Sequence, residues 1–375
     1  MTTARKTAQI PLLAALTAAL LVAAGPATAS LPIPKKPPTV KATEVAQKKN
    51  DRTAGQADVD TGETSLPVSD VDENIALPDY PAGARIMSGE MKTYTIGEED
   101  TLLDIARHFS LGYVELRAAN PDVDPWAPMP GETMVIPSMR LLPRAKQEGI
   151  LVNLGEMRLY YFKEAGKPPL SYPLGIGREG LGTPTGETRI LRKADGPVWR
   201  PTERMRKEKT WLPVSVPPGA ANPLGTHALY LGFPQILIHG SNKPWGIGRR
   251  VSSGCMRMYP EDIIKMFNMT PIGTKVTIVN QPIKIGWYGG GLYLEANPSM
   301  TQSNEIEIDG THTAKPLDDG LKKFIKDVAG KSADDIDWMT VKKAVRERRG
   351  YPIQIVVPKK KSDADETSNA TRVYN

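Results

Sequence analysis

The 375-residue sequence has a single cysteine, four histidines and few aromatic side chains, which make up 6% of its residues. A lone thiol excludes an intramolecular disulfide, and so few soft ligands argue against a zinc site. We therefore expect neither a metal nor another cofactor. The net charge of +6 is modest and no nucleic-acid-binding module is recognisable, so nucleic acid is not an expected partner. No stretch after residue 24 is long and apolar enough to cross a membrane.

The first 29 residues have the pattern of a secretory signal peptide. Arg5 and Lys6 give a positive start, an uncharged apolar run covers residues 10–24, and Ala-Thr-Ala at 27–29 offers a cleavage site. The alternative is a retained membrane anchor, but the run is shorter than the ~20 residues that a spanning helix needs. We predict an exported protein that does not span the membrane once this segment is removed.

The lone cysteine, Cys255, lies sixteen positions after His239, which ends an apolar stretch. A thiol attacks as its thiolate, and a nearby histidine can take its proton and return it to a leaving amine. Gly254 permits a tight bend, backbone N–H groups beside Cys255 offer an oxyanion hole, and Arg257 offers a fork for a carboxylate. The alternative is an inert buried cysteine, which the neighbouring residues disfavour. His227, which precedes another apolar stretch, is expected to be structural.

Residues 30–78 are rich in proline and then in small polar residues, which predicts a disordered tether. A compact unit is expected over 79–140, with strand, helix, helix and strand in its core at 92–138. This core resembles a LysM module at Tyr94-Thr95-Ile96, Asp100-Thr101-Leu102, Asn120-Pro121, Pro130-Gly131 and Val135-Ile136-Pro137. The resemblance implies binding to N-acetylglucosamine-containing glycans such as peptidoglycan.

The region over 149–281 is rich in short strand candidates separated by turns of glycine and proline, which is typical of a β-sandwich or barrel. One helix is expected within it, over 260–267. An α+β extension over 282–358, with a second helix over 334–347, is expected to pack on this region or to serve as an interaction element. Residues 359–375 are polar and predict a disordered tail.

The motifs around the cysteine resemble the YkuD-type L,D-transpeptidase catalytic domain. They are His239-Gly240-Ser241, Gly246-Ile247-Gly248, Ser252-Ser253-Gly254-Cys255-Met256-Arg257-Met258 and, upstream, Gly175-Ile176-Gly177 and Thr183-Pro184-Thr185-Gly186. The resemblance implies a mainly β protein with a β-sandwich catalytic domain at 149–281. It also implies that Cys255 is the nucleophile and His239 the proton acceptor and donor, with substrate or oxyanion support from Ser253, Gly254, Arg257 and Gly240.

Many members of that family have a histidine at the position of Ser253, and we expect activity to survive this difference. The implied reaction is attack of Cys255 on the bond between an L-centre and D-Ala in a tetrapeptide stem of peptidoglycan. D-Ala leaves, and the thioester passes to an amine of another stem, giving a 3–3 cross-link, or to a lysine of an outer-membrane lipoprotein. The resemblance further implies a periplasmic Gram-negative enzyme that carbapenems acylate.

Two alternatives to this function remain. Transfer to water would make the protein an L,D-carboxypeptidase on the same scaffold. A protein that only binds peptidoglycan through its LysM unit would need no working thiol. If the LysM unit is a separate module, removing residues 92–138 weakens binding to the wall and leaves the thiol chemistry on soluble fragments intact.

Overall fold

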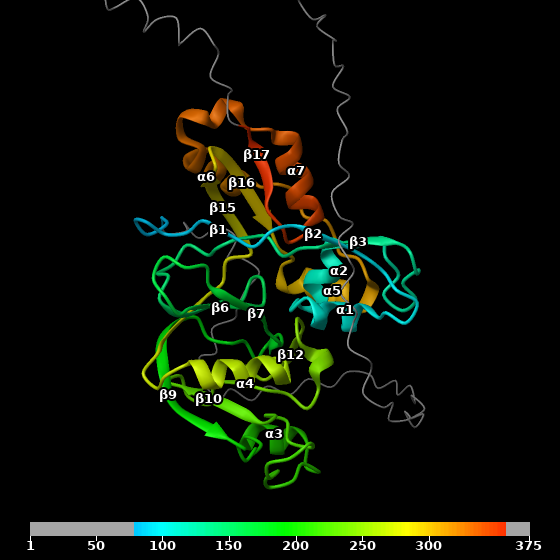
Figure 1. Cartoon of the computed structure of the whole chain (residues 1–375), viewed down its shortest axis with the longest axis vertical. Coiled ribbons are helices and arrows are strands. Elements are labelled where there is room, and N and C mark those ends of the chain that lie inside the picture. Colours follow the sequence, from blue (N-terminus) through cyan, green and yellow to red (C-terminus); the bar gives the residue numbers. More distant parts are fainter. Residues whose placement is uncertain (1–78, 358–375) are drawn as a thin grey trace, which may run out of the picture. The chain divides into compact units, whose positions relative to one another are not determined.

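The computed structural model describes residues 79–357 (Figure 1). The predicted signal peptide (1–29), tether (30–78) and tail (359–375) lie outside the described residues. Between residues 79 and 357, no helix is long and apolar enough to cross a membrane. The described part is mainly β, as predicted, and its strands gather chiefly into one eight-stranded sheet and a separate three-stranded sheet.

The first unit has the expected order of strand, helix, helix and strand. Its elements are β1 (Met87–Ser88), β2 (Lys92–Thr95), α1 (Leu102–His108), α2 (Tyr113–Ala119), β3 (Thr133–Ile136) and β4 (Arg140–Leu141). β2 pairs antiparallel with β3, and β1 with β4. The Thr101 hydroxyl caps α1 by accepting from the Asp104 N–H at 3.2 Å. Asn120 ends α2, and its amide holds β3 by donating to the Val135 carbonyl at 2.8 Å and accepting from the Val135 N–H at 2.7 Å.

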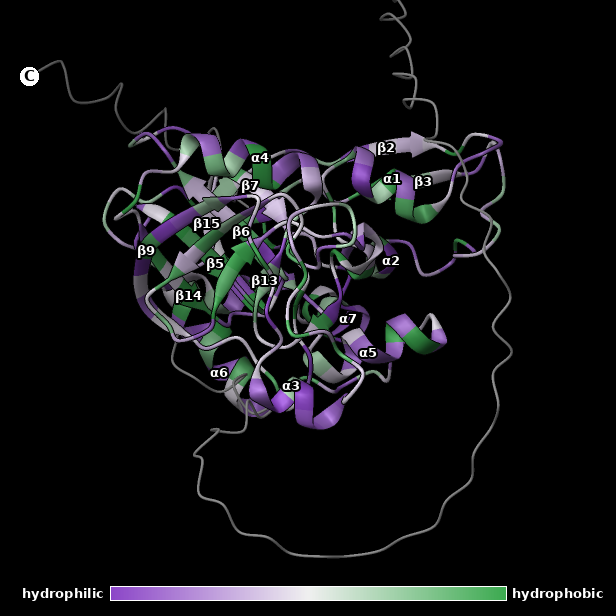
Figure 2. Ribbon diagram, turned by 90° about the horizontal axis from the view of Figure 1, so that it is seen from below, coloured by the Kyte–Doolittle hydropathy of each residue, from purple (hydrophilic) through white to green (hydrophobic). Residues whose placement is uncertain are grey.

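The eight-stranded sheet carries most of the catalytic region. Its order is β13-β11-β10-β9-β14-β5-β6-β7, made by β5 (Gly149–Asn153), β6 (Arg158–Phe162), β7 (Leu170–Pro173), β9 (Gly186–Asp195), β10 (His227–Leu231), β11 (Leu237–His239), β13 (Met256–Arg257) and β14 (Lys275–Val279). The long strand β9 joins two halves, because residues 186–189 pair with β14 and residues 190–195 pair with β10. Buried side chains of both halves, such as Val152 and Ile238, share one core. Figure 2 shows β5 as largely hydrophobic and β9 as more polar.

Shorter elements complete this region. They are β8 (Ile176–Gly177), α3 (Glu203–Glu208), a 3-10 helix (Pro244–Gly246), β12 (Arg250–Ser252) and α4 (Pro260–Met269). β12 runs parallel to β8. α4 begins at Pro260, the predicted start, with Glu261 and Asp262 in its first turn, where acidic side chains stabilise a helix. It packs near the start of β10, where the Phe267 ring meets the His227 ring at 4.6 Å.

The C-terminal part has a core of its own. Its elements are β15 (Ile283–Tyr288), β16 (Gly291–Ala296), α5 (Met300–Asp309), α6 (Asp319–Ala329), a 3-10 helix (Gly330–Asp335), α7 (Trp338–Glu347) and β17 (Ile353–Val356). The strands form an antiparallel sheet in the order β15-β16-β17. The helix predicted over 334–347 was wrong at its start, because Asp337 caps α7 by accepting from the N–H groups of Met339 and Thr340 at 3.0 Å each.

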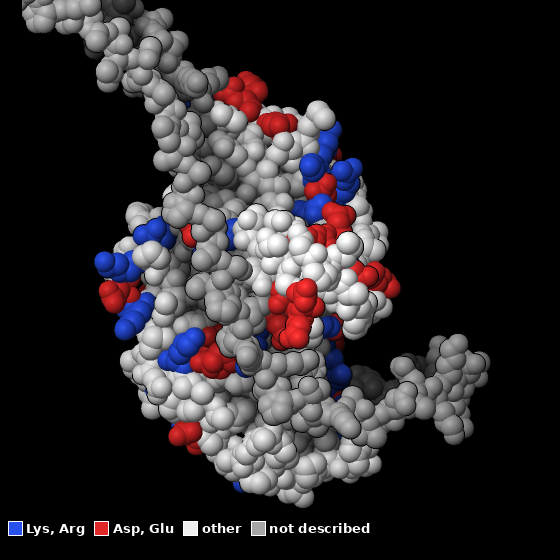
Figure 3. All heavy atoms as spheres, turned by 45° about the vertical axis from the view of Figure 1, so that its right-hand side comes forward, with Lys and Arg blue, Asp and Glu red and all other residues white. Residues whose placement is uncertain are grey.

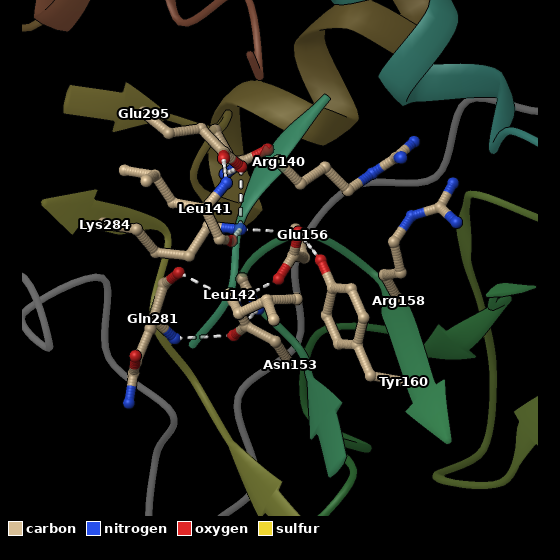
Figure 4. Close-up of polar contacts among 12 residues, drawn as sticks. Arg140, Leu141, Leu142, Asn153, Glu156, Arg158, Tyr160, Gln281, Lys284 and Glu295 are labelled. Carbon is tan, nitrogen blue, oxygen red and sulfur yellow. Dashed lines mark hydrogen bonds and ion pairs between the residues drawn. The ribbon is translucent and has the colours of Figure 1, made fainter. Parts of the chain in front are cut away.

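A buried polar cluster joins this C-terminal part to the catalytic sheet (Figure 4). Lys284 of β15 pairs with Glu156, in the turn between β5 and β6, at 2.7 Å and with Glu295 of β16 at 2.8 Å. Lys284 also donates to the Leu141 carbonyl at 2.6 Å, and Glu295 accepts from the Leu141 N–H at 2.6 Å. Tyr160 donates to Glu156 at 2.8 Å. The extension is therefore packed on the catalytic region, which is one of the two arrangements that the sequence left open.

A second buried cluster joins the first unit to the same sheet. Glu115 of α2 pairs with Arg158 of β6 at 2.7 Å and with Arg140 of β4. Burial raises the pKa of Glu115, but the two guanidiniums outweigh burial and hold this pKa at about 2.

On the surface, the described part of the face in Figure 3 carries cations and anions interspersed rather than gathered by sign. That face therefore offers no continuous basic track for a polyanion.

Candidate functional site

Cys255 and His239 lie at two neighbouring strands, β13 and β11, at one end of the eight-stranded sheet. β11 and β13 run parallel, with His239 opposite Arg257 and Ile238 opposite Met256. Cys255 directly precedes β13, two residues before Arg257. Because alternate residues of a strand share a face, Cys255, Arg257 and His239 all lie on the same face. The predicted pair is thus brought to one edge of the sheet, with the Cys255 thiol half-buried and the His239 ring buried.

The backbone just before the thiol is fixed by two hydroxyl groups. Gly254 has φ = 102°, as its predicted role in a bend requires, and a Cβ there would lie 3.2 Å from the Ile236 side chain. The buried Thr183 hydroxyl donates to the Gly254 carbonyl at 2.8 Å, and the Ser252 hydroxyl donates to the Cys255 carbonyl at 2.5 Å. In a trans peptide the N–H points opposite to the C=O. Because the Gly254 carbonyl points toward Thr183, the Cys255 N–H of the same peptide points away from Thr183. No backbone carbonyl within residues 79–357 accepts from that N–H.

The thiol of Cys255 is half-buried and uncharged at rest. Its Sγ donates to the Gln235 carbonyl at 3.3 Å. Burial raises the pKa of Cys255 above its ordinary value, while a backbone hydrogen bond from Leu237 and the nearby Arg257 guanidinium oppose the rise. Gln235 has φ = 61°, which is unusual for a residue with a side chain, and this turn brings its carbonyl to the thiol.

His239 is buried and is neutral at physiological pH. Its Nδ1 lies 2.6 Å from the Gly240 carbonyl. A carbonyl only accepts, so Nδ1 carries the proton in this bond and Nε2 is the basic nitrogen. Burial and repulsion from Arg257 lower the pKa of His239 to about 4, against the carbonyls of Gly240 and Leu224. The side chains of His239 and Cys255 do not hydrogen-bond to each other, so the resting site holds a thiol and an imidazole rather than an ion pair.

Arg257 has no counter-charge among the residues that the structure describes. Its Nε is buried without a hydrogen-bond partner. Burial lowers the pKa of Arg257. A Cβ on Gly246 would lie 3.7 Å from its Nη1, which puts the loop after His239 beside the guanidinium. A guanidinium that is partly desolvated and unpaired is suited to a ligand carboxylate, which it can bind through two parallel hydrogen bonds.

The remaining predicted residues fall into different places. Ser253 is half-buried, and its hydroxyl has no hydrogen-bond partner between residues 79 and 357. Gly240 orients His239 through its carbonyl, but its N–H donates to the His227 carbonyl at 3.1 Å and so is not a free oxyanion donor. His227 lies on the opposite face from His239, because its neighbour Ala228 is the residue paired with His239.

The sequence did not predict the roles of two residues of the site. Thr183 belongs to a Thr-Pro-Thr-Gly motif, which indicated a turn but not that its hydroxyl reaches Gly254, 71 positions away. Gln235 carried no signal, because its contact with the thiol is made by the backbone. Within residues 79–357, no three His, Cys, Asp or Glu side chains lie together in a way that could hold a metal ion.

Comparison with known proteins gives a consistent result. Residues 147–278 match the YkuD family, described as the L,D-transpeptidase catalytic domain. The Salmonella typhimurium protein named "Probable L,D-transpeptidase ErfK/SrfK" is 37% identical over 299 residues, which cover 77% of this chain and 94% of that protein. The Escherichia coli protein named "Probable L,D-transpeptidase YbiS" is 36% identical over 282 residues, which cover 73% and 89% of the two chains.

Among solved structures, the catalytic domain of an Enterococcus faecium L,D-transpeptidase acylated by ertapenem is 21% identical. The alignment covers 36% of this chain and 98% of that one, with a TM-score of 0.29. A Mycobacterium tuberculosis L,D-transpeptidase is 14% identical over 40% of this chain and 69% of that chain, with a TM-score of 0.26.

Proposed function

Because this chain belongs to the L,D-transpeptidase family, we propose that it cross-links peptidoglycan stems through a thioester on Cys255. The chain is an L,D-transpeptidase, and the proposal concerns which residues act and on what. One observation carries it: the single thiol lies on the same face as a buried neutral imidazole and a guanidinium without a counter-charge. An attacking group, a base and an anion-binding group are what acyl transfer from a peptide needs.

In the first step, the thiol proton passes to Nε2 of His239 as Sγ attacks the carbonyl carbon between the L-centre and D-Ala. A C–S bond forms, and the oxyanion is stabilised by the N–H of Cys255, which Thr183 orients through the Gly254 carbonyl. His239 then gives its proton to the amine of D-Ala, and the C–N bond breaks. Arg257 binds a carboxylate of the stem and so positions the scissile bond.

In the second step, an acceptor amine attacks the thioester, its proton passes to His239, and the C–S bond breaks to restore the thiol. We propose the side-chain amine of a second stem as the acceptor, which gives a 3–3 cross-link. A lysine of an outer-membrane lipoprotein presents the same chemistry and is the second acceptor. Water would give a carboxypeptidase, and the buried positions of His239 and Thr183 favour an acceptor that the site binds over free solvent.

We further propose that the enzyme works in the periplasm and is held at the wall by the unit over 92–138. The signal-peptide pattern of residues 1–29 and the relatives in Salmonella and Escherichia support export in a Gram-negative cell. The strand–helix–helix–strand order supports a LysM-type glycan site. A carbapenem is expected to acylate Cys255, as ertapenem acylates the Enterococcus faecium domain.

Product analysis with purified disaccharide tetrapeptide tests this proposal. The expected product has the mass of two stems minus one D-Ala, and Cys255→Ala forms none of it. Release of D-Ala without coupling would support the nucleophile and contradict stem cross-linking. A peptide bearing a lipoprotein C-terminal lysine, added in that case, separates lipoprotein attachment from hydrolysis. Equal activity of Cys255→Ala and the wild type would overturn the proposal.

A further inference from the structure

We propose that the unit over 92–138 also positions the active-site loop over 244–250, so that catalysis depends on this unit even for soluble substrates. This inference rests on the proposed function, because it assigns a further role at the same site. It differs from the expectation for a separate LysM module, in which removing the unit spares the thiol chemistry.

The first turn of α2 is bonded directly to this loop. The Tyr113 N–H donates to the Ile247 carbonyl at 3.3 Å, and the Val114 N–H donates to the Gly248 carbonyl at 3.2 Å. The N–H groups of a first helical turn have no partner within the helix, so the loop supplies acceptors that α2 would otherwise lack. The loop in turn gains a fixed backbone position from a rigid helix.

The two backbones meet at a pair of glycines. A Cβ on Gly112 would lie 2.6 Å from the Gly248 Cα, and a Cβ on Gly248 would lie 2.2 Å from the Gly112 Cα. Gly248 has φ = 74°, which also favours glycine, whereas Gly112 has an ordinary φ of −82°. Glycine at position 112 is therefore required by the contact alone and not by its backbone conformation.

Arg249, the next residue of the loop, is held by both accessory parts of the chain. Its guanidinium lies 3.8 Å from the centre of the Tyr113 ring of α2 and pairs with Glu307 of α5 at 2.8 Å. Both the pair and the stacking are partly buried, so solvent screens them less than a surface ion pair. The loop is thus fastened from two sides by elements that lie outside the catalytic sheet.

The same loop borders the reacting groups. It follows His239 and leads through β12 to Gly254 and Cys255. The Gly248 N–H donates to the Leu174 carbonyl at 3.1 Å, and Gly246 lies beside the Arg257 guanidinium. A shift of the loop against α2 would therefore move the backbone that lies beside the Arg257 guanidinium. Misplacement of a reacting group by about 1 Å can cost about 100-fold in rate.

The test compares full-length wild type with Gly112→Ala, which adds one methyl group at the contact. Gly97→Ala is the matched control, since it lies in the same unit and its Cβ would meet only a side chain, that of Asp100 at 3.3 Å, and no backbone. Two readouts are taken: hydrogen exchange of the amides over 246–250, and kcat/KM for D-Ala release from soluble disaccharide tetrapeptide. For Gly112→Ala we expect faster exchange in the loop and a fall in kcat/KM of at least about 10-fold.

A folded Gly112→Ala protein with wild-type exchange and wild-type kcat/KM would overturn the inference. If Gly112→Ala does not fold, Tyr113→Leu, which removes from α2 the ring that stacks on Arg249, decides in its place. We expect faster loop exchange and a fall of about 3-fold in kcat/KM, and no change in either would again overturn the inference. Hydrogen exchange does not depend on catalysis. An inactive wild type would therefore contradict the proposed function, while the exchange rates would still test the contact between α2 and the loop.

Discussion

Two groups of buried charges in this molecule differ in one respect. At the junction of the catalytic sheet and the C-terminal part, Lys284 is fully buried and contacts two carboxylates, Glu156 and Glu295, at 2.7 and 2.8 Å. At the active site, Arg257 is partly buried and, within residues 79–357, contacts none. Burial raises the pKa of Glu295 and Lys284 opposes the rise, whereas burial lowers the pKa of Arg257 without an opposing carboxylate.

The difference separates a structural charge from a functional one. Desolvating an ion costs several kcal/mol, and a protein recovers this cost only through good counter-charges and hydrogen bonds. At the junction, the ion pairs of Lys284 offset the desolvation cost, so these charges hold two parts of the chain together. At the active site, no counter-charge offsets the desolvation cost of Arg257. A ligand that brings a carboxylate can offset part of that cost, and a stem peptide carries such a carboxylate. Substitutions at the two clusters should therefore have different effects, on stability at the junction and on activity at the site.

The largest effect is expected from Lys284→Met. This change leaves two buried carboxylates without a cation, and we expect it to lower the free energy of unfolding by about 3–5 kcal/mol. Lys275→Met is the control, because Lys275 pairs with Glu148 at 2.8 Å on the surface, with 65% of its side chain exposed, and should cost less than about 1 kcal/mol. Urea unfolding of both variants measures the difference, and equal losses would contradict the structural reading of the junction.

The next effect concerns pH. His239 has a pKa of about 4 in the folded protein, below its ordinary value of about 6.5. Below pH 6.5 the unfolded chain therefore binds a proton that the folded chain does not, and stability is lost as pH falls from 6.5 to 4, by roughly 3 kcal/mol in all. His239→Gln cannot titrate, so the difference in unfolding free energy between wild type and variant should shrink over this interval. A constant difference from pH 7 to 4.5 would mean that His239 is not buried and neutral.

The smallest loss of stability, and a selective effect on activity, is expected from Arg257→Met. Removing a partly buried charge that has no counter-charge also removes its desolvation cost, so the free energy of unfolding should stay the same or rise, unlike that of Lys284→Met. Losing a charge-assisted bond to the substrate should cost about 1.5–3 kcal/mol in kcat/KM, or roughly 10- to 100-fold. Arg257→Lys, which keeps the charge but not the fork, should fall between. An Arg257→Met variant that loses several kcal/mol of stability but keeps the wild-type kcat/KM would reverse our assignment.

Much of this fold was predictable because the signals are local. α1, α2 and the strand over 275–279 follow from apolar periodicity, a capping Thr101 and the Asn-Pro stop at 120–121. The Cys255 and His239 pair followed from residue types and family motifs. That His239 is neutral and does not hydrogen-bond to the thiol could not be predicted, because the pKa of His239 depends on burial and on Arg257, which the register of β11 and β13 brings opposite.

Contacts between distant segments were not predictable from one sequence. The hairpin of β15 and β16, with Gly289 and Gly290 both at positive φ, had a local signal that we did not use. In contrast, Thr183 reaches Gly254, and Gly112 touches Gly248, only because separate elements happen to meet in the fold. Such contacts depend on how the backbones of distant segments approach each other, and the pattern of side chains in one sequence does not predict that approach.

The central claim is that Cys255 carries the acyl group. Wild type and Cys255→Ala are mixed with disaccharide tetrapeptide without an added acceptor, and the reaction is quenched in acid within the first turnovers. The mass of each intact protein is then measured by mass spectrometry. We predict that the wild type alone gains the mass of the substrate minus D-Ala, that digestion places this mass on the peptide containing Cys255, and that hydroxylamine removes it as it does a thioester. An adduct on another residue, or the same adduct on Cys255→Ala, would contradict the account.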